Sequence, residues 1–285
     1  MLSSIRGSAI AVAKLWFSLR RRWARQHVSR RHRVKVNRTV PYLSLSLSLL
    51  LASGRAVAVD VTMAFGDNLP PYILSASDAG IEVEIVRAAL AYRGHVLRAK
   101  FLPMGRIPFA FIAGTVDAIM MDVGMNMEPR GGYYAMPPVL YDNVFYTLRS
   151  RHLSIATPDD LKGHSIMAFV GAARRYPEWL AARSHVPAYS ERNNQAVQPL
   201  LLALGRYEVV LSDRAIFRYY TLLYQRAHPG FVMPALDEHA FTRANPNDYR
   251  PVFRDASVRD DFNAGLIYLR KIGYDRAIYD RYLKE

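Results

Sequence analysis

The chain has 285 residues, 51% of them hydrophobic, which argues against a disordered protein and allows a large core or two lobes. Its net charge of +14 is uneven: residues 1–58 hold twelve Lys and Arg and no acidic residue, leaving 26 basic against 24 acidic residues elsewhere. The folded part is therefore nearly neutral, so the charge gives no reason to expect nucleic-acid binding.

Residues 1–58 have the pattern of an export signal. A basic region precedes the apolar stretch 40–52, and Ala56-Val57-Ala58 fits the small-x-small rule for signal peptidase. We expect cleavage after Ala58 and a periplasmic mature protein. A retained membrane anchor is the alternative, but the apolar stretch is shorter than the roughly 20 residues that span a bilayer.

The first part of the mature chain predicts alternating strands and helices. VDVTMAF from Val59 alternates like a strand, and the Pro70-Pro71 pair predicts a loop after it. Apolar spacing and Gly94 then predict a helix over 81–92, followed by a strand over 96–101.

The next segment, 101–130, continues this order. It predicts a short helix around 109–112 that stops at Gly114, a buried strand over 116–123 and a loop carrying Arg130. The order βαβαβ implies a parallel sheet, and ligands bind beyond the carboxyl ends of the strands in such sheets. Arg130 is therefore placed to meet an anion.

A second, smaller α/β unit follows. Its predicted strands are 143–148, 164–170 and 207–211; its predicted helices are 157–163, 171–180 and 194–204. Ser212-Asp213 follows the last of these strands and precedes a helix at 214–224.

The remaining sequence predicts a return to the first unit. A strand at 231–236 leads back, and amphipathic helices at 258–272 and 274–283 end the chain. We therefore predict an α/β fold of two lobes, each a mixed, mostly parallel sheet flanked by helices. Lobe 1 is 59–148 with 237–285, lobe 2 is 149–236, and the hinge crossings lie near 146–150 and 232–237. Two lobes joined by two crossings suggest a cleft between them, and such clefts hold small ligands.

With these elements in this order, the chain resembles the family 3 extracellular solute-binding proteins, the periplasmic receptors of polar amino-acid uptake systems. The resemblance extends from about Val61 to Lys284 and rests on the order and spacing of short phrases rather than on any one of them. The phrases are Pro70-Pro71-Tyr72, Gly114-Thr115-Val116-Asp117-Ala118-Ile119, Glu128-Pro129-Arg130, Asp160-Leu161-Lys162-Gly163, Gly205-Arg206-Tyr207-Glu208, and Phe262-Asn263 followed by Gly273.

The resemblance implies a ligand-binding role for two residues. Arg130 would grip a ligand carboxylate, and Asp213, on the other lobe, would accept a hydrogen bond from a ligand amine, so that both bonds form only when the cleft closes. Arg106 offers a second anion contact. Val123 and Met125 stand where amino-acid binders commonly carry hydroxyl residues.

Each candidate also has an ordinary structural interpretation. Arg130 and Arg106 are plausible surface arginines, and Asp213 is a suitable helix N-cap. Tyr72 and Phe65 are expected to line the cleft, with core packing as the alternative.

Other chemistries find little support. The eight histidines show no metal-binding spacing, the methionines are assigned to packing rather than copper binding, and cysteine is absent. We expect no cofactor and no metal.

The expected function is a monomeric, non-enzymatic binding protein. It would capture an amino acid or related organic acid and deliver it to an inner-membrane ABC permease. The alternatives are a sensing module without transport and, with less support, a dehydratase-like enzyme that uses Glu128 or Asp213 as its acid.

Overall fold

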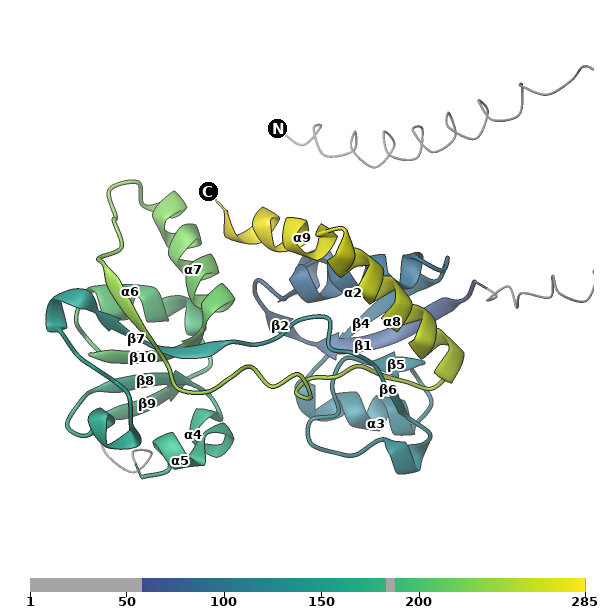
Figure 1. Ribbon diagram of the computed structural model, residues 1–285, viewed down its shortest axis with the longest axis horizontal. Helices are drawn as coiled ribbons and strands as arrows, with labels where there is room; N and C mark the ends of the chain where they lie inside the picture. Colours follow the sequence, from purple (N-terminus) through teal and green to yellow (C-terminus); the bar gives the residue numbers. More distant parts are fainter. Residues whose placement is uncertain (1–57, 183–187, 285) are drawn as a thin grey trace, which may run out of the picture. The chain divides into compact units, whose positions relative to one another are not determined.

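The computed structural model describes residues 58–182 and 188–284. Apart from Ala58, the predicted export signal lies outside these residues. The described chain forms two α/β lobes, each built on its own five-stranded sheet (Figure 1). No helix in the described ranges is long and apolar enough to cross a membrane.

The first sheet has the strand order β4-β1-β5-β12-β6. Its strands are β1 (Asp60–Gly66), β4 (Val96–Leu102), β5 (Ala118–Ile119), β6 (Tyr133–Tyr134) and β12 (Val252–Phe253). β1 pairs in parallel with both β4 and β5, which confirms the predicted βαβαβ arrangement. β5 is shorter than the predicted strand, since the chain soon leaves extended backbone and Val123 has a φ of 53°.

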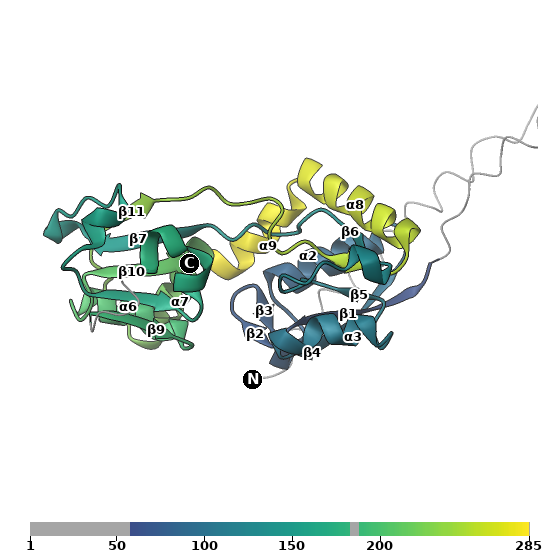
Figure 2. The same ribbon diagram turned by 90° about the horizontal axis from the view of Figure 1, so that it is seen from below.

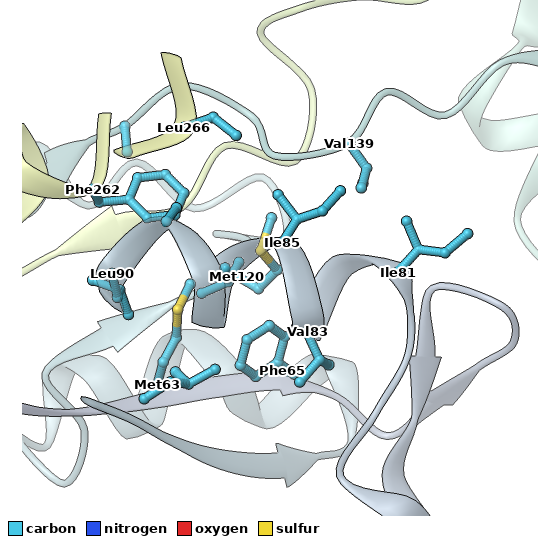
Figure 3. Packing of buried hydrophobic residues seen from close by; sticks show 14 of the residues in the cluster. Met63, Phe65, Ile81, Val83, Ile85, Leu90, Met120, Val139, Phe262 and Leu266 are labelled. Carbon is cyan, nitrogen blue, oxygen red and sulfur yellow. The ribbon is translucent and has the colours of Figure 1, made fainter. Parts of the chain in front are cut away.

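Helices α2 (Ile81–Ala91), α3 (Ile107–Ile112), α8 (Ala256–Lys271) and α9 (Tyr274–Leu283) belong to this lobe. Figure 3 shows apolar side chains of β1 meeting those of α2, with Phe262 and Leu266 of α8 on the other side of α2. α2 and α8 pack closely at Gly265, where an added Cβ would lie 2.0 Å from the Ala89 carbonyl oxygen. A hairpin of β2 (Asn68–Leu69) and β3 (Ile73–Leu74) encloses the cis peptide bond between Pro70 and Pro71.

The second sheet has the order β11-β7-β10-β8-β9. Its strands are β7 (Asn143–Leu148), β8 (Ile166–Phe169), β9 (Tyr189–Arg192), β10 (Val209–Asp213) and β11 (Leu236–Ala240). β10 is parallel to β8 and antiparallel to β7, so this sheet is mixed.

The helices of the second lobe are α4 (Ala172–Arg175), α5 (Pro177–Leu180), α6 (Gln198–Ala203) and α7 (Arg214–Ala227). The predicted continuous helix over 171–180 is two short helices, because Pro177 cannot continue the hydrogen bonding of α4. Short 3-10 helices occupy Ser75–Ser77, Met104–Arg106, Glu128–Arg130, Arg149–Arg151, Pro158–Leu161 and Gln195–Val197.

Strand pairing differs from the predicted lobe boundaries at both crossings. β7 was assigned to the first lobe, but it pairs with β10 and β11 in the second sheet. The strand predicted at 231–236 is β11, which begins at Leu236 and also pairs with β7. The first crossing is therefore residues 135–142 and the second crossing residues 241–251, and both are visible as long connections in Figures 1 and 2.

The polar sequence of β11 explains the misplacement. Its residues, LDEHA, are intermediate or exposed, and the strand lies at the edge of the sheet with one neighbour. An edge strand does not require the apolar pattern by which buried strands are recognised.

Candidate functional site

Arg130 projects from a loop that is held in place by hydrogen bonds of Asp122 and Tyr134. Asp122 Oδ1 accepts a hydrogen bond from the Gly124 amide at 2.9 Å, and Asp122 Oδ2 accepts one from the Tyr134 hydroxyl at 2.5 Å. The Tyr134 hydroxyl in turn accepts from the Met127 amide at 3.1 Å. Arg130 is exposed, and its guanidinium has no ion pair or side-chain hydrogen bond with any described residue. It is thus free to bind an external anion.

Val123 and Met125, in the same loop, give it an apolar rim. Their exposed fractions are 50% and 36%. Val123 adopts a φ of 53°, which is unfavourable for a β-branched residue and indicates that the surrounding contacts impose this conformation.

Arg106 leaves the same edge of the first sheet as the Arg130 loop. It ends the 3-10 helix Met104–Arg106, just after β4, whereas the Arg130 loop follows β5. Because β4 and β5 are both parallel to β1, their carboxyl ends share one edge. Arg106 is also exposed, without a side-chain partner among the described residues. Two unpaired cations therefore lie on loops of the edge where open α/β sheets bind ligands.

Tyr72 and Asp213 contact each other directly. The Tyr72 hydroxyl donates to Asp213 Oδ1 at 3.0 Å, which joins the first lobe to the end of β10 in the second. Asp213 Oδ1 also accepts from the amides of Ala215 and Ile216 at 2.9 and 3.1 Å and so caps α7, while Oδ2 accepts from the Asp142 amide at 2.8 Å.

Asp213 is therefore buried and hydrogen-bonded through both carboxylate oxygens. Only 2% of the residue is exposed, and burial raises the pKa of its carboxyl to about 6 against the opposing effect of its hydrogen-bond donors. The N-cap role confirms the structural alternative for this residue. In this arrangement the Tyr72 hydroxyl occupies Oδ1, so a ligand amine that binds this oxygen competes with Tyr72.

Phe65 fills the core of the first lobe. It is 0% exposed and packs beneath α2 (Figure 3), with its ring centroid 6.1 Å from that of Phe101. The expectation that Phe65 lines the cleft is wrong, and the alternative of core packing is confirmed. The position of Phe65 on β1 directs its side chain under α2 and away from solvent.

The second lobe supplies its own anion to its strand-end amides. Glu191 accepts from the Gly171 and Ala173 amides at 2.7 and 2.9 Å, directly after β8, and from the Tyr189 hydroxyl at 2.7 Å. These donors lower the pKa of Glu191 although its partial burial opposes them. The amides after β8 are consequently occupied and offer no free backbone donor to a ligand, whereas Arg130 and Arg106 of the first lobe are exposed and unpaired among the described residues.

Sequence reasoning missed a buried cluster of tyrosines around Glu82. Glu82 is 0% exposed; its Oε1 accepts from the Tyr141 hydroxyl at 3.4 Å, and its Oε2 is buried without a partner. The ring of Tyr141 lies 4.5 Å from that of Tyr72 and 4.8 Å from that of Tyr249, measured between centroids. Desolvation raises the pKa of Glu82 to about 8.

Helical periodicity contained the signal for this burial. Glu82 precedes the apolar residues Ile85, Val86 and Ala89 by three, four and seven residues. That spacing places it on the buried face of α2.

A second polar link involves Arg175 of α4. Its Nη1 donates to the Tyr249 hydroxyl at 3.0 Å, and its Nη2 forms an ion pair with Asp248 Oδ2 at 2.5 Å. Arg175 thereby ties the second lobe to the second crossing. No cluster of three metal-ligating side chains occurs within residues 58–182 and 188–284.

Comparisons with known proteins bear on the fold. No protein-family model matches the chain, and no curated protein does. An ancestral cationic amino acid solute-binding protein matches at 16% identity and a TM-score of 0.58, over 79% of this chain and 96% of that one.

Two further solved structures match this chain over the same lengths, 79% of this chain and 96% of each of theirs. Substrate-binding domain 2 of GlnP from Lactococcus lactis, in an open conformation, matches at 19% identity and a TM-score of 0.55. A histidine kinase sensor domain with similarity to periplasmic binding proteins matches at 22% identity and a TM-score of 0.54. At these identities the likeness shows the fold alone: the chain has the two-lobed fold of periplasmic binding proteins.

Proposed function

We propose that this protein is a solute-binding protein that captures a small carboxylate-bearing solute, an amino acid or a related organic acid, as its two lobes close. Arg130 is the main carboxylate contact and Arg106 a second one. The observation that carries the proposal is the unpaired, exposed guanidinium of Arg130 on the loop that leaves the carboxyl end of β5. The solved structures of similar fold include a cationic amino acid solute-binding protein, which agrees with this ligand class.

Asp213 provides the second contact in this proposal. Closure around a ligand amine would exchange the hydroxyl of Tyr72 for the ammonium group, which is a stronger, charge-assisted donor. The bond between Tyr72 and Asp213 would then compete with the ligand, and its loss in Tyr72→Phe is expected to strengthen amine binding.

We further propose that the protein is exported, acts as a monomer and delivers its solute to an inner-membrane ABC permease. Ligand sensing without transport is the second candidate, favoured by the likeness to a histidine kinase sensor domain. Neither candidate requires the chain to be an enzyme, and the compared structures are binding proteins and a sensor domain.

A thermal-shift screen against amino acids and dicarboxylates tests the ligand class. A ligand at a hundred times its Kd stabilises the protein by about 2.7 kcal/mol. Titration calorimetry of any hit with Arg130→Ala should then show binding weakened about 10- to 100-fold, the value of a charge-assisted contact.

Arg206→Ala is the matched control. Arg206 is also exposed without a side-chain partner among the described residues, but it lies after α6 in the second lobe. Equal affinity in the wild type and Arg130→Ala refutes the assignment of Arg130. Turnover of the hit, followed by mass spectrometry, would instead support the enzymatic alternative.

A further inference from the structure

A cavity of about 610 Å³ lies against the two crossings, apart from the proposed ligand contacts. Residues 136–140 of the first crossing and Pro246, Asn247 and Arg250 of the second line it, together with side chains near the junction of α8 and α9. Neither Arg130, Arg106 nor Asp213 is among the lining residues. Its volume is within the roughly 300–1,000 Å³ typical of small-molecule sites.

Two arginines with unused donors line this cavity. Arg270 Nη2 donates to the Pro137 carbonyl oxygen at 2.6 Å, and Arg250 Nε donates to the Ala135 carbonyl oxygen at 2.9 Å. The Arg250 guanidinium also lies over the ring of Tyr134, 5.2 Å from its centroid. The bonds to carbonyl oxygens hold both guanidinium groups in position. Neither arginine forms an ion pair with a described acidic residue, so the other N–H groups of each are available.

Asp275 adds an acceptor that lacks a donor. It lines the cavity, and its Oδ1 is buried with no hydrogen-bond partner. A buried acceptor left unpaired is costly, and such a group calls for a donor. Because a carboxylate turns readily about its terminal torsion, a donor bound in the cavity meets either oxygen.

We propose that this cavity binds a small dicarboxylate that also carries a hydroxyl or ammonium group. The two carboxylates pair with Arg250 and Arg270, and the hydroxyl or ammonium group donates to Asp275. Binding in this cavity does not rest on the function proposed above, because the two sites share no residue, whereas an effect on lobe closure does rest on it.

Occupation of the cavity would influence the movement of the lobes. A bound molecule contacts both crossings, which are the segments that must bend during closure. Tyr279, another lining residue, also meets the ring of Tyr72 edge-on at 6.4 Å, and Tyr72 bonds to Asp213 of the second lobe. The ligand of this cavity therefore acts as an effector of lobe closure.

Titration calorimetry with L-malate and succinate tests the site in the full chain carrying Arg106→Ala and Arg130→Ala. This background removes the proposed solute contacts. Malate has two carboxylates and a hydroxyl, whereas succinate lacks the hydroxyl. We expect malate to bind about tenfold more tightly than succinate and Arg270→Met to weaken malate about 10- to 100-fold.

Two further variants make the test specific. Lys271→Met removes the same charge from the next residue, which does not line the cavity, and should leave malate affinity unchanged. Asp275→Ala should abolish the preference for malate over succinate, and it provides an independent result if Arg270→Met folds poorly. Equal malate affinity in folded Arg270→Met and Lys271→Met, or a malate preference retained in Asp275→Ala, overturns the proposal.

Discussion

Replacing Glu82 by Gln should remove a pH dependence from the stability of the protein. Glu82 is wholly buried, one carboxylate oxygen has no partner, and desolvation raises its pKa to about 8 from the ordinary value of 4.5. The native state therefore keeps a proton on Glu82 at pH values where the unfolded chain has lost it. Glutamine has nearly the same shape and never ionises.

The sign and size of the effect follow from proton linkage. Between pH 4.5 and pH 8 the native state binds the extra proton, so stability falls as pH rises, by up to about 1.4 kcal/mol per pH unit. With these two pKa values the loss attributable to Glu82 is on the order of 2–3 kcal/mol between pH 5 and pH 7. Below pH 4.5 both states are protonated and the contribution is fully present.

Urea unfolding at several pH values measures this directly. Asp213 has a raised pKa of about 6 and adds its own decline at lower pH, so the relevant quantity is the difference between wild type and Glu82→Gln. Glu84→Gln is the control, because Glu84 is in the same helix but pairs with Arg281 near the surface. The reasoning is refuted if wild type and Glu82→Gln lose the same free energy of unfolding between pH 5 and pH 7.

Three backbone substitutions test the packing and the Arg130 loop by thermal and urea unfolding. Gly265→Ala should destabilise the protein by about 1–3 kcal/mol, because its Cβ would meet the Ala89 carbonyl oxygen. The control Gly105→Ala should be nearly neutral, since nothing lies within 4 Å of the new Cβ. Equal effects of the two substitutions would contradict the tight packing of α2 on α8. Val123→Gly should stabilise by about 1 kcal/mol by relieving the positive φ of 53°, a gain that must be absent if the native loop does not have this conformation. Gly124→Ala should cost about 1 kcal/mol, since its φ is +83° and only the backbone opposes the new Cβ; a neutral result would argue against that turn.

Local sequence patterns predicted the elements whose burial is regular. α2, α7, α8 and α9 occur close to their predicted positions, and β7 spans the predicted residues 143–148. Apolar spacing is a reliable signal there because each of these elements turns a defined face to a core. Short pairings such as β6 and β12, two residues each, have no such signal.

The sequence likewise predicted only part of the candidate site. The sequence placed Arg130 and Arg106 on loops after strands, and the parallel pairing of β4, β1 and β5 puts those loops at one edge. Sequence reasoning could not give the hydrogen-bond partners of Asp213 and Glu82, because these are Tyr72 and Tyr141, which are distant in the chain.

The sequence by itself determined two α/β units, the parallel β4-β1-β5 part of the first sheet and the loop position of Arg130, because alternation, helical spacing and glycine stops act within a few residues. Only the tertiary structure decided where the chain crosses between lobes, which groups hydrogen-bond the buried carboxyls and which arginines stay unpaired. Those properties arise from contacts between residues as far apart as Tyr72 and Asp213, and local patterns carry no record of such contacts.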